Sequence, residues 1–267
     1  MGSASPSANQ GPHERQLSSL AIRLLGPMEI SEEDCPRRLP PAAVARSVLA
    51  YLARHHDRPI PRDRLVGVFW PDQPESQARH SLSNALWQIR RALGPAAARL
   101  TGDLDTLTFQ LWPGDWLDVD AFEQLCVGEA QQTPQQEMAR LGRAIALYRA
   151  EFLENVYDDW ALAEREGLRE VYLQALVRLI ALHKGAGHYE QALVHARQLV
   201  AADPLRESAH RELMRLYHLL GRPRAALDQF AALHRLLADE LVISPSPATT
   251  TLYEEIAAAL QESEQPH

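Results

Sequence analysis

The sequence predicts a mixed α+β domain followed by an all-α domain, on three observations. Short apolar segments separated by Gly and Pro turns fill the first 112 residues, around one long amphipathic helix at 76–93. Beyond Pro113 the composition changes to Ala, Leu, Glu and Gln with almost no strand pattern. Within that part, residues 187–204 match residues 221–238 at an offset of 34, which is the tetratricopeptide period.

Length and composition indicate a globular protein and argue against a membrane-spanning one. The 267 residues, 46% of them apolar, are enough for two hydrophobic cores. No apolar run reaches the roughly 18 residues that cross a bilayer, and residues 1–19 lack an apolar signal segment. We therefore expect a cytoplasmic protein with a disordered leader at 1–19 and no membrane partner.

Cysteine and histidine do not suggest a metal site. Cys35 and Cys126 are far apart and lack CxxC spacing, which indicates free thiols. The 11 histidines match no HExxH motif, so we expect structural roles for them, including the scattered His183, His188 and His195. No metal and no cofactor are predicted.

Charge is unevenly distributed along the chain, whose net charge is −8. Residues 20–112 hold 12 arginines and 10 acidic residues, a net charge of +2. Residues 113–267 hold 14 basic and 24 acidic residues, a net charge of −10. The first part can therefore tolerate a polyanion, although dedicated nucleic-acid binders are often far more basic.

The first part begins with strand signals. Leu20–Leu25, Met28–Ile30 and Arg37–Leu39 are short apolar segments separated by turns, which predict a small antiparallel sheet. A first helix is expected from Ala42 to the polar residues at 55–59.

A second, short helix is expected after Pro61, with Leu65, Val66 and Phe69-Trp70 on its buried side. The two prolines between Trp70 and Ser76 force a change of direction before the long helix starts.

A β-hairpin follows the long helix. Residues 99–101 and Thr106–Leu111 flank a Gly-Asp-Leu-Asp turn, with Leu107, Phe109 and Leu111 expected to point inward. Sheet, three helices and hairpin together predict a winged helix-turn-helix domain at 20–112. In that arrangement the hairpin, with Thr106 and Thr108, can reach DNA beside the second helix of the motif.

The helix at Ser76–Leu93 is the expected recognition helix. Its apolar side chains recur at Ala78, Leu82, Ala85, Leu86, Ile89 and Leu93, which form one stripe, and Gly94 with Pro95 ends it. No acidic residue occurs between Glu75 and Asp103. Amide and guanidinium groups on the other side suit base edges and phosphates in a major groove. The candidate DNA-binding residues on this helix are Arg79, His80, Ser81, Ser83, Asn84, Trp87, Gln88, Arg90 and Arg91.

Roles can be assigned within that set. Arg79, Arg90 and Arg91 are expected to anchor phosphates, while His80, Asn84 and Gln88 sample base edges. Trp87 either packs against the hairpin or contacts a sugar or a thymine methyl group. The alternative for the whole face is an ordinary solvated helix surface, because outer helix faces are usually polar.

The second part is expected to be an all-α, tetratricopeptide-like domain at 113–262, followed by a tail at 263–267. Helices are predicted at about 119–128, 135–153 and 158–184, ahead of the repeat, and a final helix at about 248–262 caps the array. Gly187 and Gly221 are expected in the turns within helix pairs.

Seven segments match a known family in order and cover nearly all of 20–262: LLGPMEI at 24–30, RDRLVGVFWPD at 62–72, ARHSLSNALWQIRRALG at 78–94, WLDVDAFEQL at 116–125, AIALYRAEFLEN at 144–155, DPLRESAHRELMRLYHLLGRPRAALDQF at 203–230 and ELVISPSP at 240–247. The chain resembles the SARP-type regulators, in which an OmpR-type winged helix precedes a bacterial transcriptional activator domain. The hairpin departs from the family, which usually has a Gly-Tyr pair where this chain has Thr108-Phe109.

The resemblance implies a transcriptional activator that binds direct repeats as paired copies and contacts RNA polymerase. It also implies a contact between the sigma factor and the loop before the recognition helix, at Trp70, Asp72, Gln73 and Glu75. Larger relatives add an ATPase module, whereas no GxxxxGK[ST] motif occurs in this sequence.

The sequence is compatible with three kinds of function. The first is a sequence-specific DNA-binding regulator. The second is a tetratricopeptide-type interaction or effector-sensing scaffold whose winged helix does not bind DNA; such a helix should carry apolar or acidic residues on its outer face. An enzyme is the third, and adjacent carboxylates such as Asp158-Asp159 diverge on a helix, so no enzyme is predicted.

Overall fold

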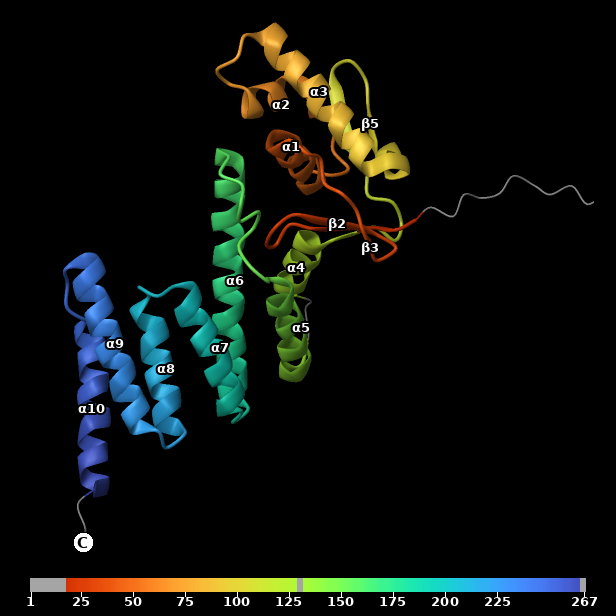
Figure 1. The fold of residues 1–267 in the computed structure, drawn as a ribbon. Coiled ribbons are helices and arrows are strands. Elements are labelled where there is room, and N and C mark those ends of the chain that lie inside the picture. Colours follow the sequence, from red (N-terminus) through yellow and green to blue (C-terminus); the bar gives the residue numbers. More distant parts are fainter. Residues whose placement is uncertain (1–17, 129–131, 265–267) are drawn as a thin grey trace, which may run out of the picture. The chain divides into compact units, whose positions relative to one another are not determined.

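In a computed structural model, residues 18–128 and 132–264 are described, and the chain divides into two compact units (Figure 1). The first unit extends to Leu117 apart from Leu24–Pro27, which belongs to the second unit beginning at Asp118. The fold is mostly helical with a small sheet region. The predicted leader up to residue 17 and the end of the predicted tail, 265–267, lie outside the described residues.

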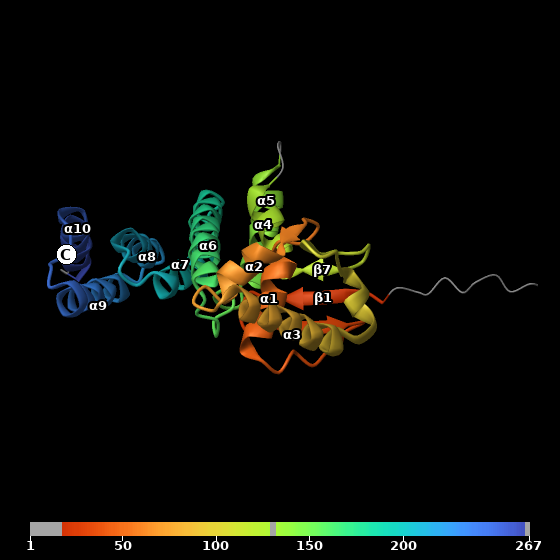
Figure 2. The ribbon, with the colours of Figure 1, turned by 90° about the horizontal axis from the view of Figure 1, so that it is seen from above.

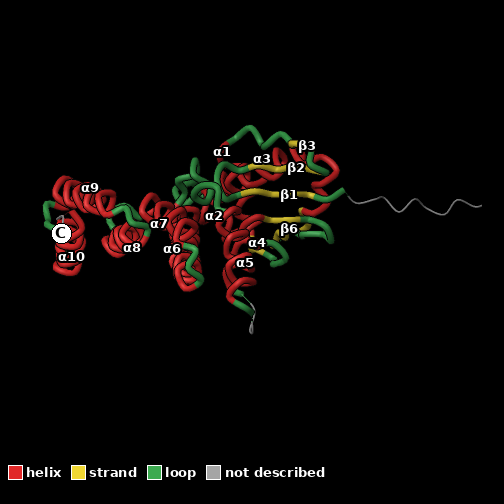
Figure 3. Tube along the Cα trace, turned by 90° about the horizontal axis from the view of Figure 1, so that it is seen from below, coloured by secondary structure: helices red, strands yellow, loops and turns green. Residues whose placement is uncertain are grey.

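A four-stranded sheet opens the first unit. Its strands are β1 (Leu20–Arg23), β2 (Glu29–Glu32), β3 (Cys35–Pro36) and β7 (Trp116–Leu117), in the order β3-β2-β1-β7. β1 pairs antiparallel with β2 and parallel with β7. Figure 3 shows β1 and β2 side by side in this sheet.

Two predicted strands need correction. The strand expected at Leu20–Leu25 ends at Arg23, because the Asp118 carboxylate accepts the backbone N–H groups of Leu24 and Leu25 at 2.8–3.0 Å. The strand expected at Arg37–Leu39 is wrong. A two-residue turn with positive φ at Glu33 and Asp34 pairs Cys35 and Pro36 directly with β2, so the strand is completed before Arg37.

Three helices follow β3 in the chain: α1 (Ala43–Arg54), α2 (Arg62–Phe69) and α3 (Glu75–Leu93). α3 packs against α1 and α2 (Figure 2). All six apolar residues predicted for the buried stripe of α3 are buried, and the helix ends at Gly94 as expected. On α2 only Leu65 is fully buried, while Val66, Phe69 and Trp70 are half-buried.

The hairpin belongs to a second, three-stranded sheet with the order β4-β6-β5. β5 (Leu100–Gly102) and β6 (Thr106–Phe109) follow the short 3-10 helix η1 (Gly94–Arg99), and β4 (Ile60–Pro61) pairs with β6. Leu111 was expected to point inward on the last strand, but it lies beyond β6 and is half-buried.

The second unit consists of successive helices: α4 (Asp118–Val127), α5 (Pro134–Leu147), α6 (Asp159–Gly185), α7 (Tyr189–Ala202), α8 (Glu207–Leu219), α9 (Pro223–Leu241) and α10 (Pro247–Glu264). Each packs against the next in the chain (Figure 1). Gly187 and Gly221 stand in the α6–α7 and α8–α9 turns with φ of +74° and +68°, as expected for turns that only Gly adopts without strain.

The helix predicted at 135–153 is too long. α5 ends at Leu147, because the backbone after it forms hydrogen bonds with the segment 24–26. The Leu153 N–H donates to the Leu24 carbonyl at 2.9 Å, and the Gly26 N–H donates to the Glu151 carbonyl at 3.1 Å. Among residues 18–128 and 132–264, no helix has both the length and the apolar content that crossing a membrane requires.

Candidate nucleic-acid interface

The outward face of α3 carries the candidate residues. Arg79, His80, Ser83, Asn84, Trp87, Arg90 and Arg91 are exposed, and Ser81 and Gln88 on the shoulder are half-buried. The helix presents this face because its apolar stripe is fixed against α1 and α2. The outward face of α3 therefore carries amide, hydroxyl, imidazole, indole and guanidinium groups.

In the first turns of α3, the charge of Arg79 is paired with two carboxylates. Nη2 of Arg79 lies 2.8 Å from Oδ1 of Asp63 on α2 and 2.9 Å from Oε1 of Glu75. The hydroxyl of Ser83 donates to the backbone carbonyl of Arg79 at 2.9 Å. The sequence interval without acidic residues did not reveal this pairing, because Asp63 approaches α3 from the preceding helix.

In the middle of α3, two polar side chains are available for an external partner. Within the part of the chain that the structure describes, the side chains of His80 and Asn84 have no hydrogen-bond partner. They are four residues apart, so they stand one above the other on the same side of the helix. Both can donate and accept, which is the property that recognition of a base edge requires.

The last turns of α3 border a hollow of about 620 Å³. Trp87 is 56% exposed, and the Arg91 guanidinium lies over its ring at 5.3 Å from the centroid. The other side of the hollow is the segment 36–41, and no residue of the hairpin lines it. Packing of Trp87 against the hairpin, one of its two expected roles, therefore does not occur at this hollow.

Arg37 and Arg38 are functional candidates that sequence reasoning missed. Both line the hollow opposite Arg91 and both are exposed. Arg37 pairs with Glu32, whereas Arg38 and Arg90 form no ion pair with any described residue. The adjacent arginines were a visible signal, but their assignment to a strand concealed it.

Two shoulder residues also hold the fold together. Oε1 of Gln88 accepts the backbone N–H of Ala42 at 3.2 Å, which ties α3 to the start of α1. The hydroxyl of Ser81 donates to Oε1 of Gln73 at 3.1 Å. Each therefore offers DNA only the hydrogen-bonding capacity that remains, which for Gln88 is its amide NH₂.

The loop before α3 is partly bound to that helix. Gln73 is held by Ser81, and Glu75 lies in the first turn of α3, paired with Arg79. Trp70 is half-buried with its ring 5.9 Å from that of Phe69. Asp72 is the member of the predicted polymerase contact that stays fully exposed without an ion pair among the described residues.

The hairpin tip is negatively charged. The carboxylate of Asp103 accepts the backbone N–H groups of Thr106 at 2.7 Å and Asp105 at 2.8 Å, and these bonds lower its pKa. Leu104 between them is 89% exposed, and Thr106 and Thr108 are half-buried on β6. The tip therefore offers a closely approaching phosphate two carboxylates in addition to the threonine hydroxyls.

Comparison with known proteins identifies the family. The model of the bacterial transcriptional activator domain matches residues 117–257, more than half of the chain. Regulatory protein AfsR of Streptomyces coelicolor is 26% identical over 250 residues, covering 92% of this chain and 25% of AfsR. Regulatory protein DnrI of Streptomyces peucetius is 27% identical over 240 residues, covering 85% of this chain and 88% of DnrI. The chain thus spans about a quarter of AfsR and most of DnrI.

A solved structure shares the fold. Mycobacterium tuberculosis EmbR, solved in complex with a low affinity phosphopeptide, matches with a TM-score of 0.69 and 23% identity over 94% of this chain and 66% of EmbR. The resemblance to SARP-type regulators is therefore confirmed. The chain belongs to the bacterial transcriptional activator domain family.

Proposed function

We propose that this protein is a sequence-specific transcriptional activator whose α3 binds in the major groove of duplex DNA. The observation that carries the proposal is the outward face of α3, where exposed amide, imidazole and guanidinium groups stand on a rigid helix. Relatives named as regulatory proteins, AfsR and DnrI, support the same role.

The arrangement of the first unit supports a winged helix at 20–112. Three helices precede a hairpin, and α2 and α3 are joined by a short turn, which is how helix-turn-helix proteins place their second helix in a groove. The helical region from 113 to 262 is then the activator domain, with Gly187 and Gly221 marking tetratricopeptide-like helix pairs.

Each exposed group of α3 is given a role by its surroundings. His80 and Asn84, free of intramolecular bonds among the described residues, read base edges. Arg90 and Arg91 bind phosphates, and Arg38 extends that contact across the hollow beside Trp87. The remaining candidates contribute at the edges of this surface: Arg79, Ser81, Ser83, Gln88, Thr106 and Thr108.

The rest of the proposal concerns partners. Paired copies bind direct repeats, since one reading helix buries too little surface to select one promoter among many competing sites. The exposed Asp72 and its loop neighbours Trp70, Gln73 and Glu75 contact the sigma factor of RNA polymerase. The protein acts in the cytoplasm and catalyses no reaction.

Selection from a random duplex library tests this function. The full chain is expected to enrich one recurring motif. Asn84→Ala should change the preference at one base pair by about 1–3 kcal/mol, whereas Arg91→Ala should weaken binding to all sequences. If the correctly folded full chain enriches no motif, or if both variants select the same sequences as strongly as the natural protein, the non-DNA-binding scaffold is the better description.

A further inference from the structure

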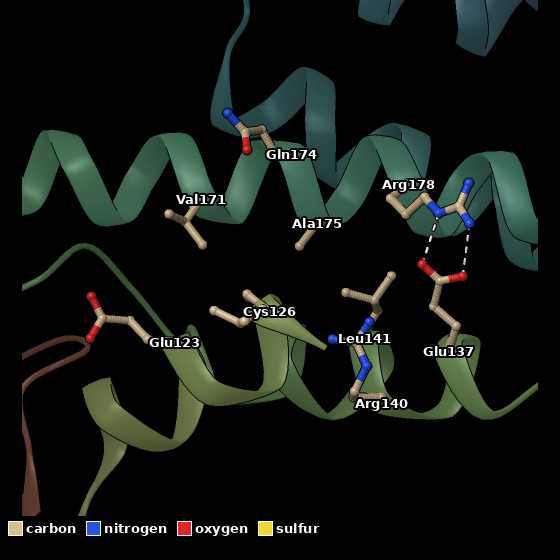
Figure 4. A pocket seen from close by; sticks show the side chains of 10 residues that line it. Glu123, Cys126, Glu137, Arg140, Leu141, Val171, Gln174, Ala175 and Arg178 are labelled. Carbon is tan, nitrogen blue, oxygen red and sulfur yellow. Dashed lines mark hydrogen bonds and ion pairs between the residues drawn. The ribbon is translucent and has the colours of Figure 1, made fainter. Parts of the chain in front are cut away.

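A second hollow lies inside the helical unit, between the α4–α5 pair and α6 (Figure 4). Its volume is about 760 Å³, within the range of roughly 300–1,000 Å³ that is usual for small-molecule sites. Its lining residues come from α4, α5 and α6. None of them takes part in the DNA interface, so the cleft is a separate feature of the second unit.

The walls of the cleft are mainly apolar. Figure 4 shows Val171 and Ala175 on α6 facing Cys126 and Leu141 on the opposite helices. Burial raises the pKa of the Cys126 thiol to about 11, so the thiol is neutral near pH 7. The small side chain of Ala175 leaves the space open where a larger residue would fill it.

One end of the cleft is fixed by an ion pair. Nε and Nη2 of Arg178 each donate to the Glu137 carboxylate at 2.8 Å (Figure 4). These bonds lower the pKa of Glu137, so the carboxylate stays charged and the pair stays neutral as a whole. The pair joins α5 to α6 across one end of the cleft.

Arg140 differs from Arg178 because it forms no ion pair with a described carboxylate. Its Nε donates to Oε1 of Gln132 at 2.9 Å and its Nη1 donates to the Leu125 carbonyl, so both acceptors are neutral. No carboxylate lies within ion-pair distance of it in residues 18–128 or 132–264. The guanidinium also lies against Gly128, where an added Cβ would come within 2.7 Å of Nη2. The Arg140 guanidinium is therefore held in place beside the cleft.

We propose that this cleft binds a small amphipathic carboxylic acid. The apolar body lies between Leu141 and Ala175, and the carboxylate accepts hydrogen bonds from Arg140. An anion is the complementary partner of Arg140, because Arg178 is already neutralised by Glu137 and the remaining carboxylate of the lining, Glu123, lies toward the opposite end of the cleft (Figure 4). A ligand in this position touches α4, α5 and α6 at once, so binding stabilises the helical unit by mass action.

Two matched probes test the proposal on the full chain: naphthalene-1-carboxylate and its neutral analogue naphthalen-1-ylmethanol. Calorimetry and thermal unfolding are expected to detect binding of the acid with an affinity at least tenfold above that of the alcohol, and a rise in Tm with acid concentration. No DNA is present, so the outcome is independent of the role of α3. Failure to bind the acid at millimolar concentration, or equal affinity for both probes, overturns the proposal.

Variants then locate the site. Arg140→Gln should bring the affinities for acid and alcohol together, whereas Arg143→Gln, an exposed arginine on the same helix outside the cleft, should leave the acid preference intact. Ala175→Phe fills the cleft and should abolish binding of both probes. If Arg140→Gln does not fold, this variant alone tests whether the acid binds in the cleft. Acid binding that survives in the folded Ala175→Phe variant places the ligand elsewhere and contradicts the proposal.

Discussion

Nη2 of Arg79 on α3 lies 2.8 Å from Oδ1 of Asp63 on α2. One arginine of the proposed recognition helix is thus neutralised by the helix that precedes it, with Glu75 as a second partner at 2.9 Å. A phosphate that approaches Arg79 must compete with two carboxylates that are themselves exposed. Exposed ion pairs contribute only about 0–1 kcal/mol, so the two carboxylates should weaken phosphate binding by Arg79 only modestly.

Asp63→Asn should strengthen DNA binding by up to about fivefold at low salt, because it removes one of the two carboxylates that pair with Arg79 and one negative charge from the interface. Fluorescence anisotropy on the selected duplex measures the effect at 50 and 200 mM salt, where the gain should shrink. Glu33→Gln, which removes an exposed carboxylate in the β2–β3 turn, is the matched control and should have a smaller effect. Equal gains from both variants would mean that only net charge matters.

Arg99 and Asp115 form a buried ion pair in the first unit. Nε and Nη2 of Arg99 donate to the two carboxylate oxygens at 2.6 and 2.7 Å, and Arg99 is 1% exposed. Asp115 also accepts the N–H of Leu20 at 2.8 Å, so the pair links η1 to β1. Burial by itself raises the pKa of Asp115, but the bonds from Arg99 and the backbone outweigh it and hold that pKa below its usual value.

Arg99→Ala should destabilise the first unit by about 3–5 kcal/mol, because it leaves the Asp115 carboxylate buried without its partner. In the natural protein the lowered pKa makes the contribution of Asp115 complete above its unfolded pKa of about 4, and that contribution is lost as pH falls through the folded pKa. Urea unfolding between pH 7 and pH 3 should show this decline, and the variant should show less of it. The exposed Arg58→Ala is the control and should change neither stability nor acid response.

Val242 occupies a left-handed position at the end of α9, with φ of +57°. A β-branched residue is strained there, and at 87% exposure it gains little packing in return. Val242→Gly should therefore raise the free energy of unfolding by about 0.5–1 kcal/mol. Val194→Gly, at an exposed position inside α7, should lower it by about 0.5 kcal/mol, so chemical denaturation of the two variants should give opposite signs.

Periodicity in the sequence was sufficient to predict the long helices and their buried sides. The six-residue stripe of α3 predicted the buried side of that helix, and the 34-residue offset predicted the turn glycines Gly187 and Gly221. Two-residue strands such as β4 and β7 carry no periodic signal and were missed.

Contacts between distant segments could not be predicted either. Asp118 ends β1 by accepting two N–H groups from residues more than 90 positions earlier, and Asp63 meets Arg79 across two helices. The hollow that brings Arg38 opposite Arg91 likewise requires the tertiary fold. The residue types on the outer face of α3 could therefore be predicted from the sequence, whereas the intramolecular partners of those residues could not.

Direct repeats test how the copies cooperate. The full chain should bind two half-sites spaced by about one helical turn cooperatively, since linked sites raise the effective concentration without new base contacts. A five-base-pair insertion puts the half-sites on opposite faces of the duplex and should abolish that cooperativity. Mobility shifts on both duplexes provide the measurement, and cooperative binding that is indifferent to the insertion argues against paired copies on one face.

Salt dependence of binding tests the docking of α3 on DNA most directly. Neutralising several phosphates releases counterions, so the affinity of the full chain for the selected duplex should fall about a hundredfold or more between 50 and 200 mM salt. Arg91→Ala and Arg38→Ala should each reduce the slope of log affinity against log salt by about one. An affinity that stays flat over this range, or a slope that neither variant changes, would contradict the assignment of this surface to DNA.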